Sequence, residues 1–77
     1  MKTKQLRNLI SETYLDITFK YKDMYGIIMP RGSDKFCLGY GDITEEYDSL
    51  DELMNAPNFD GKSLAEIAAD ISELEMV

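Results

Sequence analysis

Residues 14–22 read YLDITFKYK, and apolar and polar side chains alternate along this stretch. Leu15, Ile17, Phe19 and Tyr21 would point to one side of an extended chain, because successive side chains of a β-strand point to opposite faces. The polar residues between them would point to the other side. The alternation therefore predicts a strand with one face against a hydrophobic core and the other toward water.

Two further strands are predicted after this one, separated by turns at residues 22–23 (KD) and 30–34 (PRGSD). They are Met24–Met29 (MYGIIM), which is apolar on both sides as a central strand would be, and Lys35–Tyr40 (KFCLGY). Strands joined by short connections form an antiparallel meander. The pattern also leaves room for a short fourth strand at the edge, Ile43–Tyr47.

Three helices are predicted around this sheet. Apolar residues spaced three and four positions apart predict the first helix at Thr3–Glu12. Ser49 and Ser63 each precede a Glu by three positions, the capping-box pattern, and predict helices at Leu50–Ala56 and Leu64–Glu75. We therefore expect an α+β fold, with the two C-terminal helices packed on one face of the sheet. A chain of 77 residues has material for a single domain, residues 1–77.

Charge is divided unevenly along the chain, whose formal net charge is −7. Residues 1–41 hold seven Lys and Arg and four acids, a net charge of +3, while residues 42–77 hold one Lys and eleven acids, a net charge of −10. Six of these acids fall within eleven positions: Asp42, Glu45, Glu46, Asp48, Asp51 and Glu52. An acidic surface attracts basic surfaces and repels phosphate. We therefore expect a protein partner with a basic surface and no direct binding of nucleic acid.

The composition argues against most catalytic chemistry. The chain has no His, the side chain that most often serves as a general base or metal ligand near neutral pH. A lone cysteine, Cys37, cannot form an internal disulfide or a Cys-built metal site, and the alternation places it on the outer face of its strand. We expect no enzyme, no catalytic residue and no cofactor.

Two short motifs resemble ligand-binding loops in part. A calcium loop needs Gly in sixth place and Glu in twelfth, but these places, counted from the first carboxylate of the acidic segment, hold Tyr47 and Leu53. Residues 61–63 (GKS) match the end of a phosphate-binding loop, yet Ala56 stands where the first glycine is required. We therefore interpret residues 61–63 as a turn and a helix cap, and we expect no bound metal.

Neither a targeting segment nor a membrane span is evident. Residues 1–11 (MKTKQLRNLIS) lack the apolar stretch of a signal peptide. The apolar run at residues 27–30 is far shorter than the roughly 20 residues that cross a membrane. We expect a cytoplasmic protein without a membrane partner.

Three segments of the second half resemble small uncharacterised acidic proteins of bacteria and prophages, a resemblance that implies no activity. The segments are Tyr40–Asp42, Glu46–Leu53 and Phe59–Leu64, the last followed by Glu66 and Ile67. The chain's length, acidity and predicted element order also resemble anti-CRISPR proteins that imitate DNA. That resemblance implies carboxylates presented to a basic groove in place of phosphates.

These observations predict a non-enzymatic binding protein, inhibitory or regulatory, in which residues 42–52 engage a basic partner, in the sharpest version as a DNA mimic. The alternative is a structural or regulatory subunit that self-associates as a homo-oligomer. In that case the positive first half of one copy would meet the negative second half of another. The acidic segment would then be a solvated face without a ligand.

Overall fold

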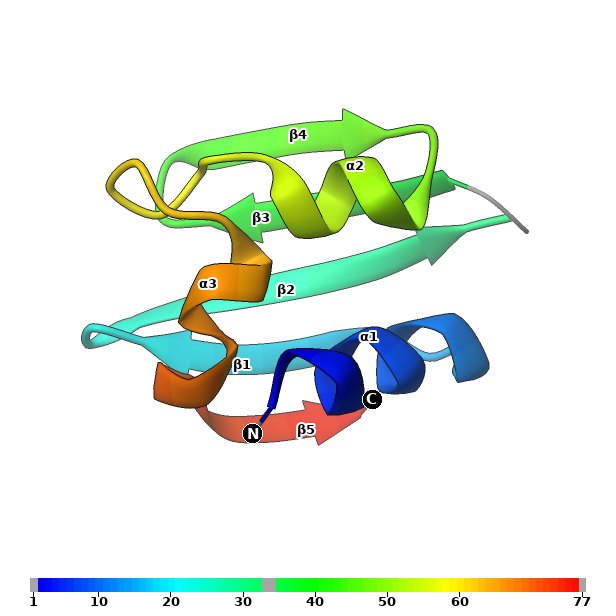
Figure 1. Cartoon of the computed structure of the whole chain (residues 1–77). Helices are drawn as coiled ribbons and strands as arrows, with labels where there is room; N and C mark the ends of the chain where they lie inside the picture. The colour runs from blue at the N-terminus through cyan, green and yellow to red at the C-terminus, as the bar shows by residue number, and fades with distance from the viewer. Residues whose placement is uncertain (1, 33–34, 77) are drawn as a thin grey trace.

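Five antiparallel strands form one sheet in the order β4-β3-β2-β1-β5 in the computed structural model, which describes residues 2–32 and 35–76 (Figure 1). The strands are β1 (Ile17–Tyr21), β2 (Met24–Arg31), β3 (Lys35–Tyr40), β4 (Ile43–Tyr47) and β5 (Ser72–Met76). The helices are α1 (Thr3–Glu12), α2 (Leu50–Asn55), α3 (Leu64–Ile67) and a 3-10 turn η1 (Ala68–Asp70). All of them lie on one face of the sheet (Figure 1), so we call the other face the open face. The predicted α+β class is confirmed.

The alternating segment forms β1, with Ile17, Phe19 and Tyr21 buried. The strand is shorter than predicted, because its pairing with β2 begins at Ile17. Leu15 lies before this pairing and is 52% exposed, so its predicted place in the core is wrong. Residues 13–16 instead connect α1 to the sheet.

The apolar run after β1 forms the middle strand, β2, as predicted. Its side chains differ between the two faces: Ile28 is fully buried under the helices, whereas Ile27 and Met29 are half-buried on the open face. The fourth strand, β4, occupies the predicted residues and pairs with β3. Of the turn predicted at residues 30–34, positions 33 and 34 lie outside the described residues.

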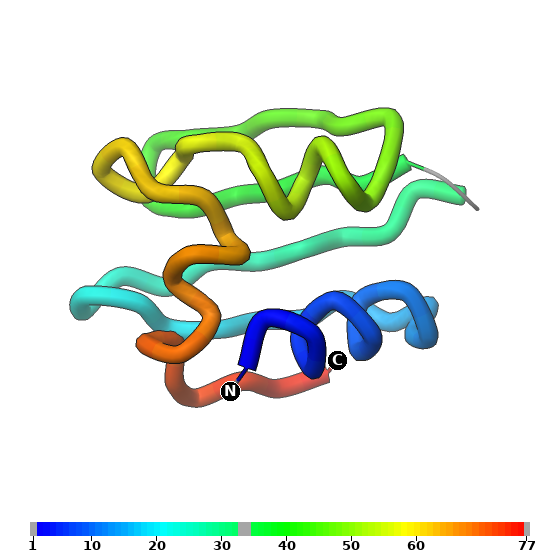
Figure 2. Tube along the Cα trace, in the orientation of Figure 1, coloured from blue at the N-terminus to red at the C-terminus, as the bar shows by residue number. Residues whose placement is uncertain are grey.

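The last predicted helix is wrong over most of its length. It ends at Ile67, and after η1 the chain forms β5, which pairs with the edge of β1 (Figure 2). Strand pairing satisfies backbone groups that β1 would otherwise leave without partners. Glu73 and Glu75 also favour this outcome, because negative charge opposes the dipole at a helix C-terminus. The β1–β5 register shifts between Thr18 and Lys20.

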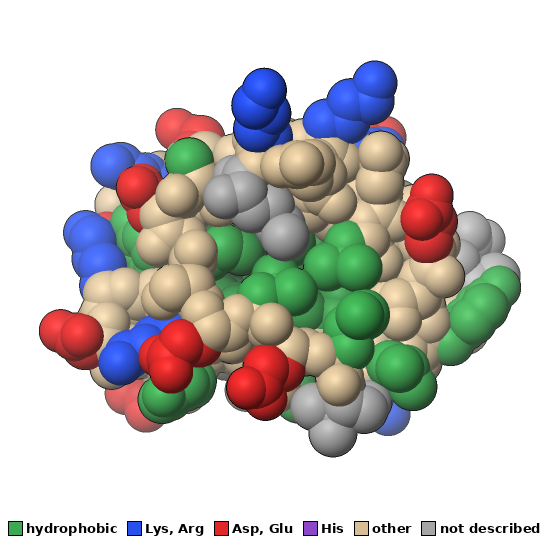
Figure 3. Space-filling view, turned by 90° about the horizontal axis from the view of Figure 1, so that it is seen from below, with side chains coloured by type: hydrophobic (Ala, Val, Ile, Leu, Met, Phe, Trp, Pro, Cys, Tyr) green, Lys and Arg blue, Asp and Glu red, His purple; other side chains and the backbone are tan. Residues whose placement is uncertain are grey.

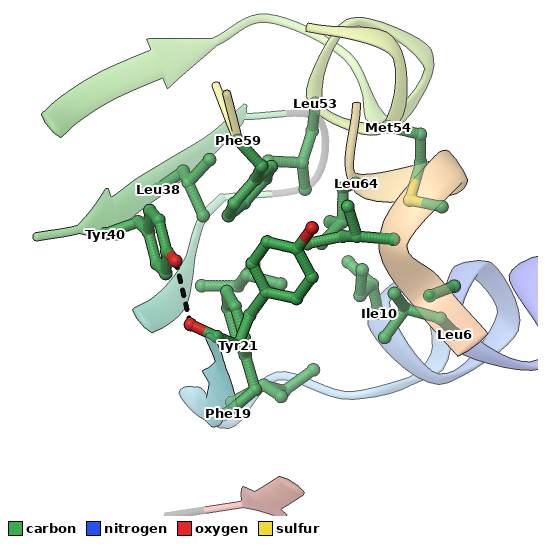
Figure 4. Packing of buried hydrophobic residues seen from close by; sticks show 14 of the residues in the cluster. Leu6, Ile10, Phe19, Tyr21, Leu38, Tyr40, Leu53, Met54, Phe59 and Leu64 are labelled. Atoms are coloured by element: carbon green, nitrogen blue, oxygen red, sulfur yellow. Dashed lines mark hydrogen bonds between the residues drawn. The ribbon is translucent and has the colours of Figure 1, made fainter. Parts of the chain in front are cut away.

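Aromatic side chains fill the core between the helix layer and the sheet (Figure 4). The predicted core aromatics Phe19, Tyr21, Phe36 and Tyr40 are all buried. Phe59, from the loop between α2 and α3, lies among them with its ring centroid 4.7 Å from that of Tyr40. The Tyr40 hydroxyl donates a hydrogen bond of 2.8 Å to the Tyr21 carbonyl (Figure 4). Burial raises the pKa of Tyr40.

The two predicted capping boxes form to different extents. At α3, Ser63 Oγ accepts a hydrogen bond from the Glu66 N–H at 3.2 Å, and the Glu66 carboxylate accepts from the Ser63 N–H at 3.0 Å. These hydrogen bonds lower the pKa of Glu66. At α2, Ser49 caps the helix, but the Glu52 carboxylate accepts from the N–H of Asp48 instead of Ser49.

Candidate functional site

Four of the six carboxylates predicted to bind a partner lie along β4. Asp42 is in the turn before the strand, Glu45 and Glu46 are within it, and Asp48 follows its last residue. All four are exposed, and we call them the acidic edge. At about 3.3 Å per residue, the segment that holds these four residues extends over roughly 20 Å.

The acidic edge lies at a border of the sheet. β4 pairs with β3 on one side, and the sheet order places no described strand on its other side (Figure 1). β4 follows β3 after a two-residue turn, in which Gly41 adopts a φ of 58°. α2 packs against β3 and β4 from the helix side. Charge on an edge strand also discourages pairing between copies, so carboxylates here have a structural role as well.

The carboxylates do not form one row on one face. Glu45 lies opposite Leu38, on the helix side, whereas Glu46 lies opposite Cys37, on the open face. The strand ends at Tyr47, so the alternation of faces along β4 does not extend to Asp48, and Asp48 is not placed on the same face as Glu46. A partner would therefore have to meet the edge of the sheet, with carboxylates on both sides of it.

The other two predicted binding residues have partners within the chain. Asp51 forms an ion pair of 2.5 Å with Arg7 of α1, and the Glu52 carboxylate accepts the Asp48 hydrogen bond described above. The structure thus divides the six residues into an acidic edge of four and a pair engaged in helix contacts.

Three ion pairs form among residues 2–32 and 35–76, and each joins a base of the first half to an acid of the second. They are Arg7–Asp51 at 2.5 Å, Lys20–Glu73 at 3.4 Å and Lys22–Asp60 at 3.6 Å. The fold therefore neutralises part of the charge asymmetry internally. Within the described chain, none of these ion pairs involves the acidic edge.

The remaining motifs have structural explanations. Asp60 and Gly61 have φ values of 57° and 84°, and Phe59 and Lys62 exchange two backbone hydrogen bonds of 3.0 Å, as around a type I′ turn. Cys37 lies on the open face by register but is only 4% exposed. Among the residues with described positions, no group of three or more metal-binding side chains is arranged to hold an ion.

Over the part of the chain that the structure describes, the helices are too short or too polar to cross a membrane. Comparison of the chain with protein-family models, curated proteins and solved structures finds no match in any of the three. The resemblances stated from the sequence therefore stay predictions.

Proposed function

We propose that this domain is a non-enzymatic protein-binding module, inhibitory or regulatory, whose acidic edge binds a basic surface of a partner protein. The observation that supports the proposal is the contrast between two groups of acids. Asp51, Asp60 and Glu73 form ion pairs inside the chain, whereas the acidic edge is exposed and outside every ion pair formed by the described residues. In its sharpest form, carboxylates on both sides of the edge take the place of DNA phosphates in a basic groove.

Surface electrostatics sets the strength of such binding. An exposed ion pair contributes about 0.2–1 kcal/mol, so four carboxylates would contribute about 1–4 kcal/mol. That range corresponds to a change in affinity of roughly five-fold to several hundred-fold. Salt screens exposed charges over about 10 Å at 0.1 M ionic strength, so the binding must weaken as salt is added.

The test uses a fluorescein-labelled decamer of lysine, whose binding is followed by fluorescence anisotropy at low and high salt. The edge variant carries Asp42→Asn, Glu45→Gln, Glu46→Gln and Asp48→Asn. The control variant carries Glu12→Gln, Asp16→Asn, Asp23→Asn and Asp70→Asn. Each set removes four negative charges, so both variants have a formal net charge of −3 instead of −7.

The proposal requires the edge variant to lose at least five-fold in affinity while the control variant stays near the unmodified chain. An equal loss in both variants would mean that the probe responds to net charge alone, and the acidic edge would not be a binding surface. Retained affinity in the edge variant would have the same consequence.

One observation favours self-association as a second candidate function. Viewed from the side of β5, hydrophobic side chains form a band across the molecule (Figure 3). Met76 of β5 is 50% exposed, and Leu9 of α1 and Leu74 of β5 are only partly buried. If this band joins two copies, light scattering coupled to gel filtration will give twice the monomer mass, and Met76→Lys will restore the monomer. A monomer at every concentration would exclude this function.

A further inference from the structure

The open face of the sheet contains a hollow of about 500 Å³. Side chains of four strands line it, and we call it the Gly39 hollow after the residue at its floor. Its lining includes Thr18, Tyr25, Ile27, Gly39 and Thr44. The volume falls within the roughly 300–1,000 Å³ of pockets that hold small ligands.

The hollow exists because a glycine interrupts a row of side chains across the sheet. The register pairs Thr44 with Gly39, Gly39 with Ile27 and Ile27 with Thr18, so these residues follow one another from β4 to β1. Gly39 has no side chain to fill its place in the row. An added Cβ there would lie 3.2 Å from Ile27 Cγ2. The floor is therefore apolar and lower than its surroundings.

One wall of the hollow is an exposed aromatic ring. Tyr25 is 62% exposed, and its hydroxyl lies 3.4 Å from the Glu73 carboxylate. The Lys20 ammonium lies 5.5 Å from the ring centroid and forms an ion pair with the same carboxylate. These contacts hold the ring at the border of the hollow, and the nearby cation is already paired.

Carboxylates lie on two sides of the hollow, whereas the cations Arg31 and Lys35, which pair on the same face, lie four register positions away from Ile27 and Gly39. Glu46 shares the open face with Thr44, about 7 Å further along β4. Glu75 lies opposite Thr18 in the β1–β5 pairing, at the other end of the row. An apolar floor between carboxylates complements an apolar side chain flanked by cations, and it disfavours anionic ligands.

We propose that the Gly39 hollow receives an aromatic or large apolar side chain from a basic segment of a protein partner, with Lys or Arg neighbours of that side chain meeting Glu46 and Glu75. The inference rests on the proposed function, because Glu46 belongs to both surfaces. It adds a specificity that charge alone does not provide: the partner must carry an apolar residue between its cations.

Three peptides test this inference: Lys-Lys-Trp-Lys-Lys, Lys-Lys-Gly-Lys-Lys and Ser-Ser-Trp-Ser-Ser, each acetylated and amidated. The chain contains no Trp, so Trp fluorescence reports the peptide alone. We expect the first peptide to bind about tenfold more tightly than either other, since partial burial of an indole in an apolar hollow gives that order of gain. Its emission should also shift to shorter wavelength.

Two variants locate the site and one serves as control. Gly39→Val fills the hollow, and Tyr25→Ala removes its wall at an exposed position where loss of folding is not expected. Tyr14→Ala is the matched control, because Tyr14 is also exposed, at 89%, and does not line the hollow. Both hollow variants should abolish the advantage of the Trp peptide over the Gly peptide, and the control should preserve it.

The outcomes separate the two proposals. If the Trp and Gly lysine peptides bind equally, the hollow is not a docking site. The same conclusion follows if the Trp peptide still binds more tightly than the Gly peptide in both hollow variants. Neither result contradicts binding by the acidic edge. If the edge variant binds both lysine peptides as tightly as the unmodified chain does, the proposed function is wrong. If Ser-Ser-Trp-Ser-Ser binds as tightly as Lys-Lys-Trp-Lys-Lys, the proposal that the partner segment is basic is wrong. If the protein is a homodimer and Tyr25→Ala dissociates it, a second copy of the chain occupies the hollow instead of a partner.

Discussion

Two glycines on opposite faces of the sheet should differ in their response to the same substitution: Gly26→Ala should destabilise the fold, and Gly39→Ala should leave its stability nearly unchanged. Gly26 of β2 lies on the helix side, where an added Cβ would be 2.8 Å from Phe19 Cε1 and Cε2 and closer still to Cζ. Gly39 lies at the floor of the hollow, where the added Cβ meets Ile27 Cγ2 at 3.2 Å. Neither glycine has a positive φ, so Ala introduces no backbone strain at either position.

The magnitudes follow from these contacts. Gly26→Ala must displace a fully buried Phe19 ring, and overpacking of this kind costs about 1–3 kcal/mol, here toward the upper end. Gly39→Ala gains about 0.4–1 kcal/mol because the unfolded chain loses freedom, and a small shift of Ile27 offsets part of this gain. The two variants should differ by about 2–3 kcal/mol, or by roughly 10–20 °C in Tm for a domain of this size.

Urea unfolding monitored by circular dichroism, together with a thermal scan, measures both values. We expect a lower midpoint with an unchanged slope for Gly26→Ala and a midpoint close to that of the unmodified chain for Gly39→Ala. Similar midpoints for the two variants would refute the β1–β2 register and the placement of the hollow on the open face.

Three further predictions concern stability. Because burial raises the pKa of Tyr40, the folded state holds its proton more tightly, so stability should fall as the pH rises above 10; Tyr40→Phe should flatten that dependence in urea titrations. Hydrogen bonds with Ser63 lower the pKa of Glu66, so the Glu66 carboxylate should stabilise the fold above about pH 4.5. This stabilisation should disappear as the pH falls through the lowered pKa, and comparison with Glu66→Gln in urea titrations measures it. Asp23 adopts a φ of 63°, so Asp23→Gly should raise stability by about 1 kcal/mol in thermal scans, whereas Lys22 is left in place because it pairs with Asp60. An unchanged Tm would contradict the turn geometry.

The sequence correctly predicted the helices, strands and turns that depend on residues only a few positions apart. The alternation around Phe19, the turn at residues 22–23 and the spacing in α1 depend on side chains a few positions apart, and these predictions are confirmed. β5 depends on the edge of β1, more than fifty positions earlier, which no local pattern contains. The apolar residues within 71–76 fit both the spacing of a helix and the alternation of a strand. The free edge of β1, which a strand here can pair with, favours the strand.

The sequence predicted which acidic residues belong to the candidate site, but it did not predict how they are arranged in space. The sequence identifies the six carboxylates, but the contact between α1 and α2 that engages Asp51 brings distant residues together. Phe59 gave no periodic signal, since it lies in a loop and enters the core from outside the regular elements. Gly39 within a strand was the available signal for the hollow, because such a glycine often marks close approach by another group.

The acidic edge is most directly tested by mapping a basic probe onto the folded chain, residue by residue. Amide chemical shifts of isotope-labelled protein should be followed by NMR while the lysine decamer is added at low salt. We expect the largest shifts in residues 42–48, and these shifts should reverse when salt is added. Shifts spread evenly over all exposed acids, or centred on Asp51, Asp60 and Glu73, would contradict it.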